Sequence, residues 1–379
     1  MACLLTRTAI VIGGGIVGAS VSYHLIKLGI KTTLYDDARE GNATTAAAGI
    51  ISPETSHYKD PAWFQLALKS GMFYGPFIVE LGLENRSNVY SKVGELTIAL
   101  NANEIESYNN TRDLVNSRHL KYGYPASDEM YEIEPQEAKQ YFPGIAPVKK
   151  AFYNKNAARI HGGELRDHIV QSANKKGLKI INETVDGLRM VEGKATGIIS
   201  DTITEADYVI ITGGAWSSLF AEQLDLKPFV EPQRGQIAQV KLLDLVDNNY
   251  CILRAFQGHY LVPWENGHFV IGATRELNSG FDPIKTIRGV QEVFREGIRV
   301  FPALENAELI EVKVGLRPRS IDDLPILGRV PNYENVILGT GMGPSGLQLG
   351  PYCGKILAEL ITGSKLIDIS NFNIGRFSK

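Results

Sequence analysis

Apolar runs and amphipathic stretches follow one another in a regular order at the start of the chain. Residues 8–12 (TAIVI) form a β-branched apolar run, which is typical of a strand buried in a parallel sheet. Residues 16–28 predict a helix, and Gly29 follows them as a C-cap. Residues 31–35 (KTTLY) predict a second strand. The pattern therefore predicts a β–α–β unit.

A glycine-rich turn joins the first strand to the helix. In the pattern G-x-G-x-x-G, Gly13 allows a tight turn, Gly15 lets the backbone approach a pyrophosphate, and Gly18 lets the helix pack closely on the strand. The helix N-terminus adds free N–H groups and the positive end of its dipole. Asp36 ends the second strand, where a carboxylate can accept hydrogen bonds from an adenosine ribose and would repel the 2′-phosphate of NADP. Because all these parts occur in order, a nucleotide site is favoured over a structural glycine turn, and FAD and NAD are both left open.

Two later segments also end a strand in glycines. Residues 206–214 (ADYVIITGG) predict a buried strand that ends in paired glycines. Residues 335–338 (NVIL) predict a strand that runs into GTGMGPSGLQLG and then a helix through Ile361. Such a loop can approach a flat cofactor, and the helix dipole stabilises negative charge on a reduced flavin. Taken alone, the loop is also compatible with an ordinary turn between a strand and a helix, although the cofactor is favoured.

The remaining segments mix helices with short strands. A hairpin signal at Glu265-Asn266-Gly267 indicates an antiparallel group over residues 236–273. The nucleotide-type segments are thus interrupted twice by β-rich inserts. The expected helices are 63–81, 103–118, 164–175 and 286–299, and the expected strands are 93–100, 151–153, 178–182, 186–191, 195–200, 236–242, 250–256, 259–263, 268–273 and 308–315.

Composition narrows the class of protein. The 379 residues correspond to two domains or one large α/β unit, and a hydrophobic content of 44% is ordinary for a globular protein. The net charge of -3 gives no general field that attracts nucleic acid. Cys3, Cys251 and Cys353 form no CxxC pair and no His pair has zinc-type spacing, so we expect no metal site and no disulfide framework. These features predict a protein of a reducing compartment, the cytoplasm.

One N-terminal segment has an alternative interpretation. The apolar run Ala9–Val21 follows Arg7, as in a signal peptide. However, the run is rich in glycine, lacks a clear cleavage site and is shorter than the roughly 20 residues that a membrane span needs. The nucleotide site explains the same residues better.

Seven segments in order resemble the glycine oxidase and D-amino-acid oxidase superfamily of FAD-dependent amine oxidoreductases, and they are most similar to bacterial glycine oxidase and D-amino-acid dehydrogenase types. Because this set covers nearly the whole chain, it is more specific than any single motif. The segments are VIGGGIVGAS (11–20), TTAAAGIISPE (44–54), VIITGGAWS (209–217), QRGQI (233–237), HYLVPWENGHFVIGAT (259–274), GLRPRSIDDLPILGR (315–329) and GTGMGPSGLQLGP (339–351).

The resemblance implies an α/β protein with a discontinuous, Rossmann-like FAD-binding domain and a second, β-rich α+β domain that binds substrate. We expect the FAD-binding domain at 1–85, 155–232 and 312–379, and the substrate-binding domain at 86–154 and 233–311. We expect non-covalent FAD, because relatives that attach the flavin carry a Cys near the position of Gly315. In relatives, backbone N–H groups matching Thr44–Gly49 hold the phosphates and the ribityl chain, and the backbone matching Val185 meets the adenine. The residues assigned to the cofactor are Gly13, Gly15, Ile16, Val17, Gly18, Asp36, Asp37, Thr44, Thr45, Ala46, Ala48, Gly49, Ile50, Val185, Thr212, Gly213, Gly214, Trp216, Arg317, Gly341, Met342, Gly343, Pro344, Ser345, Gly346 and Leu347.

A clamp for a substrate carboxylate is also implied. Arg317 matches the family's carboxylate-binding Arg, whose planar guanidinium makes two hydrogen bonds to a carboxylate. Tyr260 matches a Tyr whose hydroxyl reaches the same group. The alternatives are a salt bridge for Arg317 and core packing for Tyr260. Arg319 is expected to be structural or solvent-facing, and strand alternation places His259 on the face opposite Tyr260.

Two positions depart from glycine oxidase. Arg275 stands where glycine oxidase has an apolar residue near the substrate side chain. It either admits an acidic or larger substrate or is an exposed hairpin Arg, and we count it among the catalytic candidates. Pro344 stands where glycine oxidase has a basic residue, so a preference for small substrates is left open.

We therefore expect oxidation of a small amino acid, either a D-amino acid or a glycine-like amine. Hydride passes from Cα to flavin N5, and the imino acid then hydrolyses to the 2-oxo acid, while the protein mainly binds and orients the substrate. The alternatives are oxidation of 2-hydroxy acids, proline or N-methyl amino acids, a flavin-binding subunit without turnover and, more weakly, a NAD-dependent dehydrogenase. The electron acceptor is left open between O2 and a quinone or other carrier. If the acceptor is a quinone, we expect the protein to contact a membrane peripherally. A homo-oligomer is left open as well.

Overall fold

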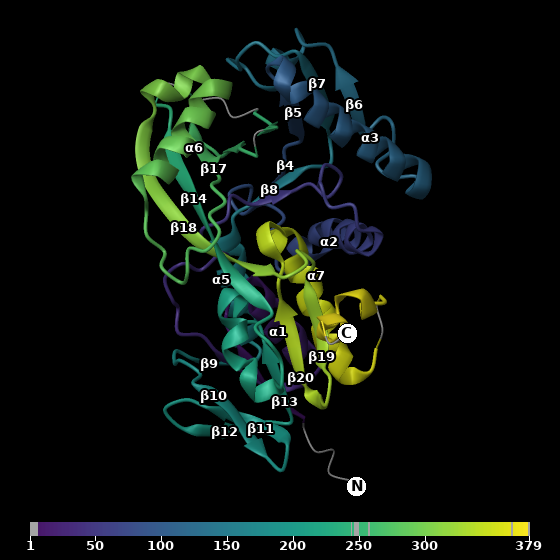
Figure 1. Cartoon of the computed structure of the whole chain (residues 1–379), viewed down its shortest axis with the longest axis vertical. Helices are drawn as coiled ribbons and strands as arrows, with labels where there is room; N and C mark the ends of the chain where they lie inside the picture. The colour runs from purple at the N-terminus through teal and green to yellow at the C-terminus, as the bar shows by residue number, and fades with distance from the viewer. Residues whose placement is uncertain (1–6, 244, 246–249, 257, 365–366, 378–379) are drawn as a thin grey trace.

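A computed structural model describes residues 7–243, 245, 250–256, 258–364 and 367–377. Two large sheets lie at opposite ends of its long axis (Figure 1). The six-stranded sheet takes strands from residues 8–35, 179–211 and 326–340, and the eight-stranded sheet takes strands from 95–154 and 230–320. The chain therefore crosses between the sheets several times. The domain boundaries expected from the sequence stay a prediction.

The six-stranded sheet forms around the predicted β–α–β unit, in the order β19-β20-β13-β1-β2-β9. Its neighbouring strands are parallel except for the antiparallel pair β19–β20. In β1 (Thr8–Ile12), Ala9 and Val11 pack on the helical side, whereas Ile10 and Ile12 pack toward a small sheet of β10, β11 and β12. Burial on both faces explains why this run is apolar without alternation. The other strands are β2 (Lys31–Tyr35), β9 (Lys179–Ile181), β10 (Gly187–Val191), β11 (Lys194–Ile199), β12 (Ile203–Glu205), β13 (Tyr208–Ile211), β19 (Ile326–Val330) and β20 (Tyr333–Thr340).

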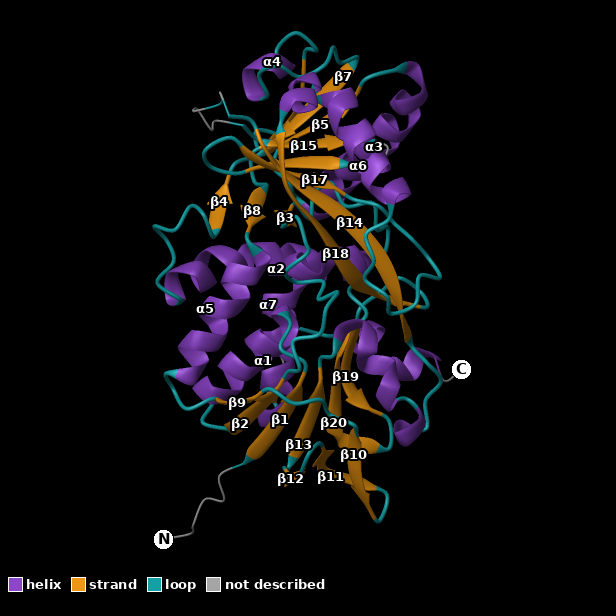
Figure 2. Ribbon diagram, turned by 90° about the vertical axis from the view of Figure 1, so that its left-hand side faces the viewer, coloured by secondary structure: helices purple, strands orange, loops and turns teal. Residues whose placement is uncertain are grey.

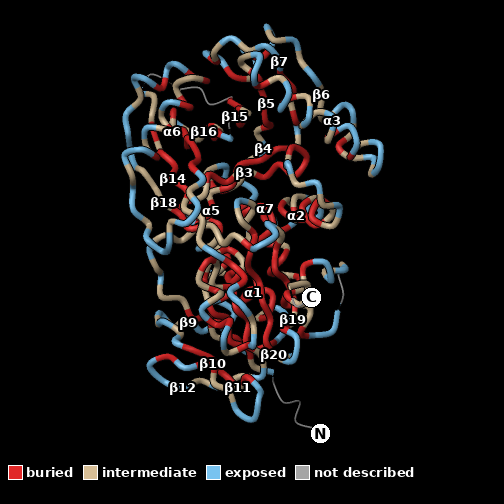
Figure 3. The backbone as a smooth tube through the Cα atoms, in the orientation of Figure 1, coloured by how far each residue is buried: buried red, intermediate tan, exposed pale blue. Residues whose placement is uncertain are grey.

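Helices cover one face of this sheet (Figure 2). α1 (Ile16–Lys27) packs against α5 (Gly162–Asn174) and α7 (Gly346–Thr362), and α7 packs against α2 (Pro61–Glu80). Gly29 follows α1 with φ 75°, the left-handed conformation predicted for this C-cap, and Gly363 ends α7 in the same way with φ 81°. Buried residues concentrate in the strands and in α7, whereas the tips of the β10–β12 sheet are exposed (Figure 3). Because α1 follows β1 and α7 follows β20, both helices begin at the same edge of the sheet.

The eight-stranded sheet has the order β18-β14-β17-β16-β15-β5-β7-β6, and only the pair β15–β5 is parallel among these described strands. The hairpin between β16 and β17 turns at Asn266 (φ 59°) and Gly267 (φ 73°), which confirms the predicted turn. α6 (Ile287–Val300) packs on β14 and β17, and the Thr286 side chain caps it by accepting a hydrogen bond from the backbone N–H of Gly289. The strands are β5 (Glu95–Ala99), β6 (Met130–Ile133), β7 (Lys150–Asn154), β14 (Val230–Lys241), β15 (Ile252–Ala255), β16 (Tyr260–Pro263), β17 (His268–Gly272) and β18 (Glu308–Ser320).

Some elements differ from the sequence prediction. The strand predicted to end at Gly315 continues through Ser320, because β18 pairs with β14 over its whole length, from Lys241↔Glu308 to Val230↔Ser320. A short sheet, in which β8 pairs with both β3 and β4, was not predicted. Among the described helices, none is long and apolar enough to cross a membrane. The elements not yet named are β3 (Ile50–Ile51), β4 (Tyr90–Lys92), β8 (Ala158–Ile160), α3 (Ile105–Tyr122) and α4 (Ala138–Tyr141).

Candidate active site

A cavity of about 480 Å³ lies where the carboxyl edge of the six-stranded sheet meets the eight-stranded sheet. All the predicted site residues line it except Gly18, Thr45 and Gly341. Gly18 packs against the carbonyl of Gly13, Thr45 is exposed, and Gly341 packs against β18 and β19. The fold therefore brings together residues that lie more than 300 positions apart in the sequence. The role of each residue in cofactor binding stays a prediction.

The glycine-rich turn is held open by its neighbours. Gly13 has φ 95°, and a Cβ there would lie 2.7 Å from the Thr212 carbonyl oxygen, so only glycine fits this turn. The Thr212 hydroxyl donates to the carbonyls of Ile12 and Gly13, each at 2.9 Å. The first N–H of α1, at Ile16, donates to the Thr44 hydroxyl at 3.0 Å. These contacts hold the backbone in a curve around one end of the cavity.

The two acids that follow β2 have different surroundings. Asp36 lies against the turn, since a Cβ on Gly14 would meet its Oδ2 at 2.5 Å, and it is 3.8 Å from Arg166. Asp37 bonds to Arg39 and accepts a hydrogen bond from the Thr184 hydroxyl at 2.9 Å. Asp36 is thus the carboxylate placed directly against the glycine turn, as a ribose-binding acid requires.

The C-terminal glycine loop forms the opposite wall. Thr340 donates from its hydroxyl to the Gly214 carbonyl at 2.8 Å, which ties the loop to the glycines that follow β13. α7 begins at Gly346, and the side chain of its N-cap residue, Ser345, makes no hydrogen bond to the backbone N–H groups of the first turn. Its N-terminus therefore presents N–H groups and a positive dipole end at the cavity.

These features fit FAD. The open backbone at Gly13–Gly15 suits a pyrophosphate, Asp36 suits a ribose, and the start of α7 suits an electron-rich ring. Cys251 and Cys353 are buried, and neither lines the cavity, whereas Cys3 lies outside the described residues. The described residues thus offer no thiol for covalent attachment.

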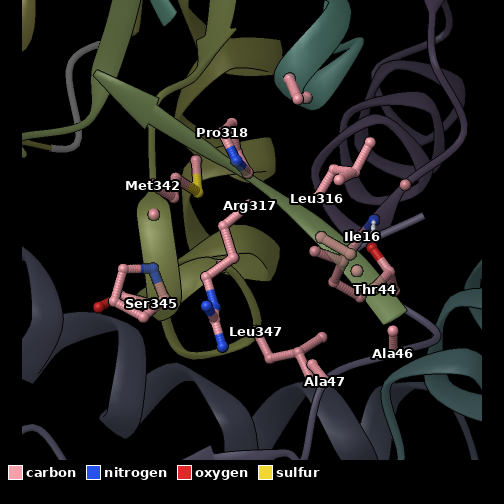
Figure 4. Close-up of a pocket in the computed structure, with 18 of the residues that line it drawn as sticks. Ile16, Thr44, Ala46, Ala47, Leu316, Arg317, Pro318, Met342, Ser345 and Leu347 are labelled. Carbon is pink, nitrogen blue, oxygen red and sulfur yellow. Dashed lines mark hydrogen bonds between the residues drawn. The ribbon is translucent and has the colours of Figure 1, made fainter. Parts of the chain in front are cut away.

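The other end of the cavity carries Arg317 on β18. Figure 4 shows its side chain projecting toward Ser345 and Leu347, across from Thr44 and Ala47. The guanidinium lies over the backbone of Gly235 in β14, where a Cβ would come within 2.3 Å of Nη2. Nη1 donates to the Thr274 carbonyl at 2.9 Å. No carboxylate of a described residue pairs with Arg317, so the predicted alternative of a salt bridge is absent from this part of the chain.

Replacing Gly235 with Ala will displace this guanidinium. The methyl group would occupy the space of the Arg317 side chain, and a misplaced binding group costs on the order of 10- to 100-fold in kcat/KM. Steady-state kinetics with a carboxylate substrate measures the effect, and visible absorbance checks that FAD is still bound. Unchanged kinetics in a variant with full FAD content would show that the position of Arg317 is unimportant.

Tyr260 is placed beside Arg317. Tyr260 in β16 pairs with Gly272 in β17. Gly272 leaves room for the tyrosine ring, since a Cβ there would lie 2.8 Å from the Tyr260 hydroxyl oxygen. Burial raises the pKa of Tyr260, and nearby Arg317 and Arg275 offset part of that rise. The hydroxyl therefore stays protonated at neutral pH and can donate to a carboxylate.

Replacing Tyr260 with Phe will weaken the binding of a simple carboxylate about tenfold, the loss expected for one hydrogen bond to a charged group. Because the pKa of Tyr260 is raised above its usual value near 10, the hydroxyl will not titrate between pH 7 and 9. Titration with acetate, followed by the flavin spectrum, measures both effects. An acetate affinity that is equal in Tyr260→Phe and in the wild type would contradict the assignment of Tyr260 to the carboxylate, and a wild-type affinity that falls between pH 7 and 9 would contradict the raised pKa.

Arg319 and His259 are the two remaining residues at this end for which the sequence analysis made a prediction, and each lies within 4 Å of a carboxylate. Arg319 pairs with Glu231 at 2.7 Å and with Asp323 at 2.8 Å, which fits the expected structural role. His259 Nε2 lies 3.5 Å from Glu292 Oε1 in α6, and His259 also lines the cavity, so its expected position on the face opposite Tyr260 stays a prediction.

His57, Tyr58 and Arg254 also line this end, and the sequence analysis did not identify them. Arg254 in β15 pairs with Glu95 in β5 at 2.9 Å, and the Glu95 side chain is fully buried. A charged residue inside each of two apolar strands was the available signal, because buried charges are normally paired. His57 and Tyr58 lie in the loop after β3, where no sequence pattern marks them.

Burial in the cavity wall, and then the charges of Arg275 and Arg254, lower the pKa of His57. His57 is therefore mainly neutral at pH 7. Its ring stacks on Tyr58, with 4.7 Å between the ring centroids.

A dinucleotide cradle that opens onto a cavity between two sheets suits a flavin-dependent oxidoreductase. The chain belongs to the FAD dependent oxidoreductase (DAO) family, whose model matches residues 8–360. It is an FAD-dependent oxidoreductase. This finding confirms the flavin and sets aside the NAD-dependent alternative and the subunit without turnover.

Known relatives share this class. The chain is 32% identical to "Uncharacterized oxidoreductase YurR" of Bacillus subtilis, over 97% of this chain and 98% of that protein. It is 25% identical to glycine oxidase of Bacillus licheniformis, over 94% and 93% of the two chains. Among solved structures, iminodiacetate oxidase from Chelativorans sp. BNC1 has 31% identity and a TM-score of 0.90, over 96% and 98%. Glycine oxidase from Bacillus cereus has 25% identity and a TM-score of 0.83, over 94% and 95%.

Proposed function

We propose that the enzyme oxidises the Cα–N bond of a small amino acid, a D-amino acid or a glycine-like amine, to an imino acid that water hydrolyses to the 2-oxo acid. The observation that carries the proposal is Arg317, a guanidinium without a carboxylate partner among the described residues, at the end of the cavity remote from Asp36. A small substrate with one carboxylate supplies the missing anion.

The residues of the chain bind and orient. Arg317 and Tyr260 hold the carboxylate, which restricts the direction of the Cα–H bond, and the wall of α7 and the Thr44–Gly49 loop limits the space around Cα. FAD, when bound, accepts the hydrogen and the electron pair of the Cα–H bond. The nitrogen lone pair then forms the C=N bond, and its surplus proton leaves to water. Water adds to the imine and releases ammonia, or an amine when the nitrogen is substituted.

A secondary amine is the second candidate. The similarity to iminodiacetate oxidase, whose named substrate has a secondary nitrogen, supports it. The same clamp also suits the carboxylate of proline or of an N-methyl amino acid. O2 and a quinone both stay open as the acceptor.

Product analysis tests the proposal. Glycine, D-alanine, sarcosine, L-proline and D-lactate are supplied in turn with O2 or a soluble quinone. We expect a 2-oxo acid and ammonia or amine in equal amounts from at least one amine, and none from lactate. Turnover of lactate alone would identify a 2-hydroxy acid enzyme instead.

A further inference from the structure

Among the described residues, four arginines line the cavity; Arg39 pairs with Asp37, and the other three lie away from the carboxylates. Among the described residues, the carboxylates that line it are Asp36, Asp37 and Glu183, and all three lie at the edge where β2 and β9 end. The opposite end carries three arginines, Arg254, Arg275 and Arg317. An anion is therefore favoured at the arginine end.

Two of these arginines have defined partners. Arg254 is neutralised by the buried carboxylate of Glu95 at 2.9 Å. Arg317 is held by the carbonyl of Thr274 and by contact with Tyr260, and the proposed function assigns it to the first substrate carboxylate. Only Arg275 is left without a role among the three.

Arg275 is exposed and also lines the cavity, so it lies where the cavity meets solvent. The Thr274 hydroxyl accepts from the backbone N–H of Gln236 at 2.9 Å and donates to Glu276 at 2.8 Å. Glu276 in turn pairs with Arg234 at 2.8 Å. In an extended segment, side chains two apart share a side, so Arg275 points away from these contacts.

Arg275 has no ion pair with any residue that the structure describes, although its charge acts on His57, Tyr58, Tyr260 and Arg317. The acid that acts on His57 and Tyr58, Asp323, is held by Arg319 at 2.8 Å. Two guanidinium groups, of Arg275 and Arg317, thus face one cavity with no carboxylate between them. Like charges repel, and an anion between them removes this repulsion.

We propose that Arg275 binds a second carboxylate, so that the preferred substrates are small amino dicarboxylates. The inference rests on the proposed function and narrows its substrate class. The second carboxylate comes either from the side chain, as in D-aspartate, or from a substituent on the nitrogen, as in iminodiacetate. The chemistry that recognises both is the same.

The test compares substrates that differ by one carboxylate. Sarcosine carries a methyl group on the nitrogen of glycine, and iminodiacetate carries a carboxymethyl group there. D-alanine and D-aspartate differ in the same way at Cα. In at least one pair, we expect kcat/KM to be at least about tenfold higher for the dicarboxylate than for the monocarboxylate. In Arg275→Gln this ratio falls to about one, because neither member of a pair then has a second guanidinium to bind. The pair that shows the preference identifies the position of the second carboxylate.

Binding gives a second readout. Malonate and acetate are not oxidised, and their dissociation constants follow from changes in the flavin spectrum. We expect malonate to bind at least about tenfold more tightly than acetate in the wild type and about equally in Arg275→Gln. Arg288→Gln is the matched control, because Arg288 is exposed, close in the chain and outside the cavity wall. It should keep the wild-type ratios.

The outcomes separate the two proposals. If no amine is turned over but malonate binding still depends on Arg275, the proposed function fails and the second anion site stands. If sarcosine or D-alanine is a good substrate and neither dicarboxylate is preferred, the proposed function stands and the role of Arg275 is wrong. Equal malonate-to-acetate ratios in wild type and Arg275→Gln would also overturn that role.

Discussion

Replacing Arg317 with Met will lower kcat/KM for the natural amine by roughly 30- to several thousand-fold. Removing one partner of an enclosed, hydrogen-bonded charge pair costs about 2 to 5 kcal/mol, and each 1.4 kcal/mol is a factor of ten. Arg317→Lys will recover only part of the loss, because an ammonium cannot make the two parallel hydrogen bonds of a guanidinium. Steady-state kinetics with the preferred amine measures both variants.

Arg319→Met is the matched control for this prediction. Arg319 lies two residues further along β18, but it pairs with Glu231 and Asp323 on the outside of the cavity. We expect its kcat/KM to stay within about threefold, as for other exposed ion pairs. An equal loss in both variants would mean that disruption of β18, and not loss of the clamp, explains the effect.

Replacing Gly18 with Ala will abolish stable FAD binding. The new Cβ would lie 1.9 Å from the Gly13 carbonyl oxygen and 2.6 Å from the Thr212 hydroxyl oxygen. α1 must then move away from β1, which opens the turn that receives the pyrophosphate, and such overpacking costs about 1 to 3 kcal/mol in stability. The ratio of visible flavin absorbance to protein absorbance, with a thermal melt, measures both effects.

Gly75→Ala serves as the control for this change. Gly75 lies in α2 with nothing within 4 Å of its added Cβ, and alanine is favoured over glycine inside a helix. We expect full FAD content and an unchanged or higher Tm. A yellow Gly18→Ala protein with the wild-type Tm would show that close packing of α1 on β1 is not needed for the cofactor.

The β–α–β unit and its glycines could be predicted almost to the residue because their signals are local. β1 and β2 have the predicted bounds, since an apolar run between turn residues specifies a buried strand without reference to distant segments. β18 could not be predicted in full. Its continuation through Arg317 and Pro318 depends on the pairing with β14, more than 60 residues earlier. The short pairings of β3 and β4 with β8 are equally non-local.

The same distinction applies to the candidate site. Arg317 and Tyr260 belong to segments that resemble a family, so the sequence alone could nominate them. For Arg254 and Glu95 the sequence offers only a charge within an apolar strand, because their pairing exists only once β15 lies beside β5. The orientation of Arg275 depends on three hydrogen bonds made by its two neighbours, and sequence left it open between the cavity and the surface.

Anaerobic reduction of the FAD-loaded protein tests most directly whether the enzyme oxidises an amine held by its carboxylate. An amino acid that is turned over and the amide of the same amino acid are added in separate experiments, and the loss of the visible flavin bands is followed in time. We predict rapid bleaching by the amino acid and bleaching at least about 100-fold slower by the amide, which offers Arg317 no carboxylate. Flavin bands that persist with every amino acid and amino dicarboxylate, or that bleach equally fast with the amide, would contradict the proposed function.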